Sequence, residues 1–540
     1  MQINNIFNKI TQPIISLFLI ILITANVFSS ASAANTSKDN GGFQKTKHIS
    51  INAFEKDIDK IYKELNQKSA FNAGNCDEYI ENITNFLLLQ SAKIYLPLTQ
   101  RDFRRLEKRG DIIVEKLFLL RLLLRKKLKE FYLQGKITPN CVKKMRMAFR
   151  YSRFMEEFIT EIRVSMNKEV PAADHRDLSQ HKYQFYLNPK YKNFRMKSGD
   201  ILLVRASNFV SAVIARIGDD DGQFSHAAMI YIDEKGIIYV IEALISKGIV
   251  IVPFEEWREK NHHARTLLFR HDNKKLAKKA AQKLHDTILE RWKAKDLMLY
   301  DFQMDDSDSK QFFCSEVVQY SFKLAGNDSM PIFQTSFKSF QNHSFLSELT
   351  IGVNKAFAPS DLEVDPHINL VAEWRNYAVT KNARMEDVIQ TKVLYWMSHK
   401  DYYLKGTFKS WLSTSVGLLG RNIFGLNSDK IPPNMPYGFI ENIIKLTDLN
   451  EILEKYLLGL ETEYFKKYGH SMDYLTMMNA LEKFRIEDCE RDITRKKEIN
   501  DRILYHIDDW EKPYKGSDSL FHNLFNTKNG LECNTQYEGF

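Results

Sequence analysis

The sequence predicts an α+β protein in which a block of clustered strands lies between two helical regions. The chain has 540 residues, and its 44% apolar and 27% charged fractions are those of a globular protein. They exclude a disordered, collagen-like or multi-span membrane chain. Only 22 glycines and 13 prolines are present, which favours long helices. The hydrophobic period becomes strand-like near Met196 and returns to a helical one near residue 385. A single core stops growing at roughly 250–300 residues, so we expect two or three domains.

The N-terminal segment has the pattern of a secretory signal peptide. Lys9 is its only charge, an apolar run extends from Ile14 to Phe28, and Ala31-Ser32-Ala33 fits the small-x-small cleavage site. The apolar run is shorter than the roughly 20 residues of a spanning helix, which favours cleavage over an uncleaved membrane anchor. We therefore expect residues 1–33 to be removed and the protein to be exported, to the periplasm or as a secreted protein.

The cysteine count is compatible with disulfides in an exported protein. Because five is odd, at least one thiol is left unpaired. Pairing by neighbourhood would leave Cys314 free, but four cysteines allow three connectivities. The chain has no CxxC or HExxH motif, so the sequence gives no support for zinc or for any other cofactor. The neighbouring pairs are Cys76 with Cys141 and Cys489 with Cys533.

An N-terminal helical region is expected over residues 34–190, where apolar residues recur at helical spacing within 51–168 after a polar linker. The basic residues of Val114–Phe131 fit the solvated stripe of an amphipathic helix, with nucleic-acid or lipid binding as the alternative. The net charge is mild: 77 Lys and Arg against 68 Asp and Glu give +9. It permits contact with anionic surfaces and does not indicate nucleic-acid binding.

A sheet domain is expected over residues 191–360. Its strands are rich in β-branched and aromatic residues and end at Gly, Asp or Pro. A Lys-rich helix and a second helix that begins close to Cys314 and ends before Gly326 follow them. The four expected strands are Gly199–Arg205, Phe224–Ile232, Ile237–Ala243 and Gly248–Pro253, and the helices are Asn273–Trp292 and Cys314–Leu324.

The C-terminal region, residues 361–540, is expected to be mostly helical, with the clearest periodicity over 384–397, 438–458 and 474–505. Between these segments, Phe408–Leu426 is apolar with scattered cations. It could lie on a membrane surface. A buried helix or loop is the commoner explanation of such a pattern.

Cys314 is the candidate nucleophile. It lies at the start of an apolar-periodic helix, after two aromatic residues. Unpaired N–H groups and the helix dipole at such a position favour the thiolate, and the same groups can stabilise an oxyanion. The alternative is an inert buried cysteine.

His226 and Glu242 are polar residues in otherwise apolar strands, and they fit the base and its orienting partner. Suppose that Glu234-Lys235-Gly236 forms the loop between their strands, with Gly236 in the left-handed conformation. The numbers of any two residues that pair across the two strands then sum to 470. His226 and Glu242 then share one face as diagonal neighbours. A two-residue loop would place them on opposite faces.

Other residues have simpler explanations. Tyr300 could donate a hydrogen bond to an oxyanion or serve only in core packing. Glu316 fits a helix-dipole role, and Asp200 follows Gly199 as a turn residue. His262 and His263 lie in a polar stretch and are expected to be solvated.

The order of these motifs resembles the YiiX/YebB-like cysteine hydrolases, the circularly permuted papain-fold branch of the NlpC superfamily. In this branch the histidine strand precedes the cysteine helix, as it does here. The resemblance spans about Lys197 to Gly326, with Ala358 to Trp374 similar to the family's downstream extension. The matching motifs are Gly199-Asp-Ile-Leu-Leu, Ser225-His226, Tyr239-Val-Ile-Glu242-Ala, Tyr300-Asp301 and Phe313-Cys314-Ser-Glu-Val.

The resemblance implies a permuted papain-like (NlpC-type) antiparallel-sheet domain. It implies Cys314 as nucleophile, His226 as base, Glu242 as its orienter and Tyr300 as a helper at the site. The expected activity is that of an amidase or peptidase without a cofactor, acting on an acyl-amide such as a cell-wall peptide. A lipid acyl hydrolase or acyltransferase similar to lecithin:retinol acyltransferase is one alternative, and an inactive scaffold that binds a partner through its helical flanks is another. The oligomeric state stays open.

Overall fold

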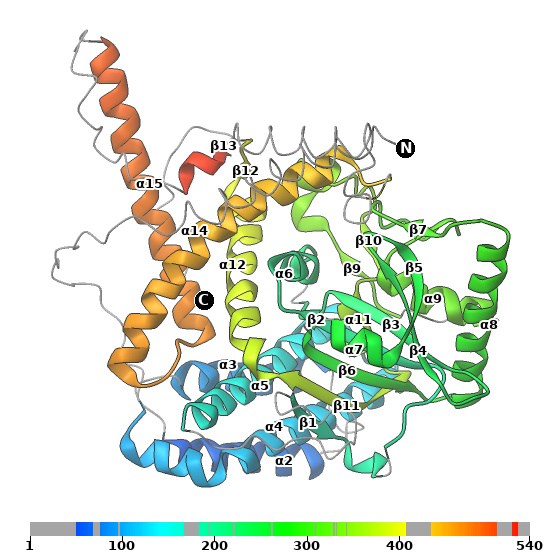
Figure 1. Ribbon diagram of the computed structural model, residues 1–540. Helices are drawn as coiled ribbons and strands as arrows, with labels where there is room; N and C mark the ends of the chain where they lie inside the picture. The colour runs from blue at the N-terminus through cyan, green and yellow to red at the C-terminus, as the bar shows by residue number, and fades with distance from the viewer. Residues whose placement is uncertain are drawn as a thin grey trace, which may run out of the picture. The chain divides into compact units, whose positions relative to one another are not determined.

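Figure 1 shows the computed structural model of the chain. Internal contacts divide it into Met1–Lys47 and His48–Phe540, and all described residues belong to the second unit. The signal peptide, the linker, Phe408–Leu426 and Cys533 lie outside the described residues. The structure describes residues 50–67, 76–94, 98–166, 183–192, 194–219, 222–260, 263–307, 309–327, 330, 332–341, 343–406, 432, 434–504 and 521–527.

The N-terminal region is helical, as predicted. Thr99 accepts from the Asp102 N–H at 3.2 Å and closes a capping box, and Thr138 with Pro139 begins the last helix. Its helices are α2 (Ile51–Gln67), α3 (Cys76–Ile94), α4 (Gln100–Leu133) and α5 (Pro139–Ser165).

The disulfide between Cys76 and Cys141 joins α3 to α5, which confirms the first predicted pair. Cys314 is a free buried thiol, also as predicted. Cys489 is disulfide-bonded. The nucleophile candidate is therefore not consumed by a disulfide.

A seven-stranded sheet forms the centre of the described fold, and each of its strands pairs antiparallel with its neighbours. The order is β1-β11-β6-β2-β3-β4-β5. The four predicted strands are confirmed as β2, β3, β4 and β5. The bounds are β1 (Tyr183–Leu187), β2 (Asp200–Ala206), β3 (His226–Ile232), β4 (Ile238–Leu244), β5 (Gly248–Pro253), β6 (His263–His271) and β11 (Ile368–Asn376).

The sequence pattern did not predict β6 and β11, because both carry charged residues that the fold buries. Arg265 in β6 pairs with Glu157 of α5, and Glu373 in β11 pairs with Arg121 of α4 at 2.7 Å. All nine residues of β6 are buried. Ion pairing removes the cost of burying these charges, so neither strand shows the expected apolar alternation. Two strands of the sheet, β1 and β11, lie outside the predicted 191–360 range.

The two faces of the sheet are covered differently. One face packs against α7 (Phe254–Lys260) through a cluster that includes Ile230, Val240 and Trp257. The helices α8 (Lys274–Lys293) and α9 (Cys314–Leu324) confirm the two predicted helices, contact each other and β3, and lie at the right in Figure 1. The helix that carries Cys314 is therefore seated directly on the strand that carries His226.

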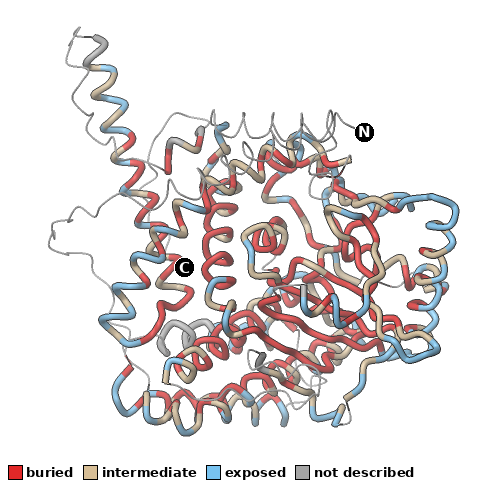
Figure 2. The backbone as a smooth tube through the Cα atoms, viewed as in Figure 1, coloured by how far each residue is buried: buried red, intermediate tan, exposed pale blue. Residues whose placement is uncertain are grey.

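The C-terminal region is helical and is joined closely to the sheet. Its long helices are α12 (Tyr377–Lys400), α14 (Tyr437–Tyr468) and α15 (Tyr474–Leu504). More than half of the residues of α12 are buried (Figure 2), and the helix contacts β6, α5 and α6 (Phe209–Arg216). No helix among the described residues combines the length and apolar character that crossing a bilayer requires. The remaining elements used below are α10 (Phe345–Glu348), α11 (Pro359–Val364), β7 (Leu299–Tyr300) and β8 (Gln311–Phe312).

Candidate active site

Cys314 is the first residue of α9, directly after β8. The helix start is capped by Glu316, which accepts the Phe313 N–H at 3.3 Å, as its expected helix-terminal role requires. The Cys314 sulfur lies 3.7 Å from the carbonyl oxygen of Ser225, and the residue is 4% exposed. At this position the unpaired N–H groups of the first turn favour an anionic sulfur and can bind an oxyanion.

The β3–β4 hairpin has the register that the sequence predicts. Met229 pairs with Ile241 and Ile232 with Ile238, so the residue numbers sum to 470. Gly236 has a φ of +83°, the left-handed conformation that the three-residue loop needs. His226 and Glu242 consequently meet on one face, with 2.6 Å between Nε2 and Oε2.

His226 also interacts with Cys314, which explains its protonation. Burial by itself lowers the pKa of His226, but hydrogen bonds to Cys314 and Glu242 and the charges of both raise it to about 10. The ring is thus an imidazolium at neutral pH and can donate a hydrogen bond toward the Cys314 sulfur. The His226 side chain is 20% exposed, which leaves it accessible at the site.

Trp257 is a site residue that sequence analysis missed. Its indole Nε1 donates to Glu242 Oε2 at 3.0 Å, the same oxygen that contacts His226. Glu242 is therefore held from two sides, and its position fixes the ring of His226. The available signal was weak: a tryptophan in a short helix between two strands, whose N–H needs a partner once buried.

Tyr300 lies in β7, which pairs in parallel with β8 just before Cys314. Its side chain lines the same cavity as Cys314. Burial raises the pKa of Tyr300 well above its ordinary value, and the negative charges of Cys314 and Asp301 raise it further. The hydroxyl thus stays protonated and able to donate, which suits the predicted helper role.

The structure changes the expectations for two residues, His263 and Asp200. His263 is not solvated: it is buried in β6 and packs on the Trp257 ring at 4.4 Å, because the stretch it begins is a central strand. His262 lies outside the described residues. Asp200 accepts the Lys197 N–H as a turn residue, but it also forms a buried ion pair with Arg270. Neither residue joins Cys314.

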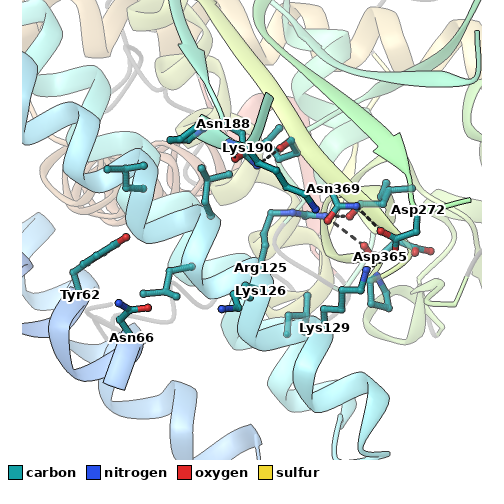
Figure 3. A pocket seen from close by; sticks show the side chains of 18 residues that line it. Tyr62, Asn66, Arg125, Lys126, Lys129, Asn188, Lys190, Asp272, Asp365 and Asn369 are labelled. Atoms are coloured by element: carbon teal, nitrogen blue, oxygen red, sulfur yellow. Dashed lines mark hydrogen bonds and ion pairs between the residues drawn. The ribbon is translucent and has the colours of Figure 1, made fainter. Parts of the chain in front are cut away.

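A second cavity lies away from these residues, between α2, α4 and the start of β11 (Figure 3). Arg125 reaches from α4 to the carbonyl oxygen of Ile368 at 2.9 Å, and Lys129 pairs with Asp272. None of the described residues that line this second cavity is a cysteine, histidine or glutamate. The predicted nucleophile, base and orienting residue therefore do not line this second cavity. Among the described residues, no cluster of His, Cys, Asp or Glu could hold a metal ion.

One stretch of the chain is similar to a known protein family. Residues 195–372 match the permuted papain-like amidase enzymes of the YaeF/YiiX type, C92 family. This confirms the resemblance to YiiX-like permuted papain-fold cysteine hydrolases for that stretch and indicates an enzyme of the cysteine amidase or peptidase type. No curated protein matches the chain. Among solved structures, the metalloprotein YiiX from Escherichia coli O157:H7 matches with 22% identity over 33% of this chain and 97% of that chain, at a TM-score of 0.27.

Proposed function

We propose that the protein is an exported cysteine amidase in which Cys314, His226 and Glu242 form the catalytic triad. The observation that carries this proposal is the position of His226, which contacts Cys314 and is held by Glu242 at 2.6 Å. A nucleophile, a base and an orienter within hydrogen-bond reach are what thiol acyl transfer requires.

The reaction follows from this arrangement. The Cys314 thiolate attacks the amide carbon, and the N–H groups at the start of α9, with the Tyr300 hydroxyl, stabilise the oxyanion. When the C–N bond breaks, the leaving amine takes the proton of His226, and the acyl group stays on Cys314 as a thioester. Neutral His226 then takes a proton from water, the resulting hydroxide displaces the sulfur, and the acid, the thiolate and the imidazolium are released or restored.

Export is part of the proposal, and it rests on the signal-peptide pattern of residues 1–33. The disulfide between Cys76 and Cys141 supports it, because structural disulfides persist in oxidising compartments. Retention as an uncleaved anchor remains the alternative.

The inactive scaffold is the main rival function. It requires that Cys314 be inert, whereas Cys314 is not in a disulfide and interacts with His226. A lipid acyl hydrolase or acyltransferase would use the same residues and differ in the acyl group it accepts. The residues that line the cavity beside Cys314 therefore determine which acyl group fits.

Acyl-enzyme trapping tests the proposal. We expect the protein to release p-nitrophenolate from p-nitrophenyl acetate beyond one equivalent, and mass spectrometry to find an acetyl group on Cys314 early in the reaction. Cys314→Ala should remove both signals. If Cys314 is alkylated by iodoacetamide but never carries an acetyl group, the amidase proposal is wrong and the scaffold is the better account.

A further inference from the structure

The cavity beside Cys314 is walled by residues from several parts of the chain. They include α6, the segment around β7, α10, α14 and the starts of α9 and α11. Cys314 itself lines this cavity, so an acyl group bonded to its sulfur must fit into the space beside it. The lining residues therefore bear directly on the chemistry of the acyl group. Most of the described lining residues are apolar, and α14 contributes Phe439, Ile443 and Leu446.

The cavity offers no partner for a charged acyl group. None of the described residues that line it is Lys, Arg or His. Its one carboxylate, Asp301, has both oxygens engaged, since it accepts the N–H groups of Gln303 and Asp305 at 2.7 Å each. A carboxylate on the acyl side would be buried unpaired and close to Asp301, at a high desolvation cost. The cavity consequently excludes acidic acyl groups and favours apolar ones.

One wall comes from α14, which lies outside the stretch 195–372 that matches the amidase family. Phe439 packs on Phe302 with 5.0 Å between ring centroids, and Asn434 donates to the carbonyl oxygen of Tyr300 at 2.7 Å. Gly438 allows α14 to approach α10 closely, because a Cβ there would lie 2.0 Å from the Glu348 carbonyl oxygen. The C-terminal region thus completes one wall of this cavity.

The size of the cavity limits the group it can hold. Its volume is about 60 Å³. That is more than the roughly 10–15 Å³ that a single water occupies, and a methylene group is close to a water in size. The space therefore suits a short chain of a few carbons rather than a long one.

We propose that the acyl side of the scissile amide carries a short, uncharged alkyl group that enters this cavity, and that α14 sets the length it accepts. The proposal rests on the amidase function above. An N-acyl chain and an unbranched apolar amino-acid side chain share this chemistry, and a long lipid acyl chain or an acidic cell-wall peptide does not.

Chain-length dependence of Cys314 alkylation tests the proposal without requiring turnover. Rate constants are measured by mass spectrometry for N-alkyl iodoacetamides from methyl to dodecyl. We expect the rate to rise by about tenfold or more between methyl and the butyl-to-hexyl probes, because each buried methylene favours binding about fourfold at best. It should then fall for dodecyl. Rates that are independent of chain length, or that keep rising to dodecyl, would overturn the length limit.

Variants of Ile443 make the test specific to α14. Ile443→Trp should abolish the preference for hexyl over methyl, and Ile443→Ala should move the optimum to longer chains. Leu458→Trp is the control, since Leu458 lies on the same helix and is 44% exposed. Equal profiles for all three variants and the parent protein would show that α14 does not form the wall.

Two amide substrates distinguish the sources of the alkyl group. Hexanoyl anilide presents an acyl chain, and a peptide anilide with norleucine on the acyl side presents a side chain. Hydrolysis of either substrate supports the proposal. A peptide anilide with glutamate in place of norleucine that is hydrolysed faster than both would overturn it. If alkylation depends on chain length but no acyl-enzyme forms, the proposed alkyl-binding cavity is supported and the amidase function is wrong. If an acyl-enzyme forms but no chain-length preference is seen, the amidase function is supported and the proposed role of the cavity is wrong.

Discussion

Replacing His226 with alanine is expected to lower the kcat/KM of amide hydrolysis by about 10³-fold or more. His226 holds the proton that the leaving amine needs and stabilises the Cys314 thiolate, so one substitution removes both contributions. The variant should also slow alkylation of Cys314 at pH 6 by about tenfold or more. At that pH a thiol without a cationic neighbour is ionised to under about 1%.

The matched control is His285→Ala. His285 stacks on Tyr231 at 4.1 Å between ring centroids and has no contact with the triad, so its loss should change neither rate by more than about twofold. The account is contradicted if His226→Ala retains most of the parent protein's activity, or if the control loses as much. Circular dichroism of both variants establishes that they are folded.

Replacing Asp387 with asparagine is expected to destabilise the protein by about 3–5 kcal/mol. Asp387 lies in α12 and is fully buried between three arginines from β2, α6 and β6. Arg205 and Arg216 each approach it to 2.8 Å, and Arg265 to 3.0 Å. Removal of the carboxylate charge leaves buried cations without full compensation. The free energy of unfolding in urea measures the effect.

The pH dependence of this loss has a definite sign. Burial by itself raises the pKa of Asp387, but the charges of Arg205, Arg216 and Arg265 lower it well below the ordinary value. A carboxylate with a lowered native pKa stabilises the fold above its unfolded pKa, roughly 3.9, and that stability is lost as the pH falls below it. The difference between the parent protein and Asp387→Asn should therefore be largest near neutral pH and shrink in acid.

An exposed aspartate provides the control for Asp387. Asp286 has a side chain that is 50% exposed, and Asp286→Asn should change the unfolding free energy by less than about 0.5 kcal/mol. Equal stability of the two variants would show that the buried charges are not coupled through Asp387.

The sequence predicted those parts of the fold in which each strand has its own apolar pattern. The strands β2 to β5 and the three-residue loop at Gly236 belong to this class, and so does the register that brings His226 to Glu242. It could not predict β6, because Arg265 is tolerated there only through Glu157 and Asp387, which are more than 100 residues away. A prediction from hydrophobic periodicity takes account of the charged residue itself but not of the distant residue that pairs with it.

The same limit applies to the site. His226 and Glu242 are predictable because each is a polar residue in an apolar strand, and Cys314 because it begins an apolar-periodic helix within a recognisable order of motifs. Trp257 and the α14 residues Phe439 and Ile443 carry no such signal, because aromatic and aliphatic residues are ordinary in helices. Their roles depend on what they pack against, and only the tertiary structure supplies that information.

The most direct test of the account is an NMR titration of the His226 ring, assigned by comparison with His226→Gln. The account predicts a pKa of about 10 for His226, lowered in both Cys314→Ala and Glu242→Gln, since hydrogen bonds and charge from these two residues raise it. The imidazolium would then be present throughout the neutral range, paired with the nucleophile. A midpoint near the ordinary value of about 6.5, unchanged in the two variants, would contradict the triad and with it the proposed amidase.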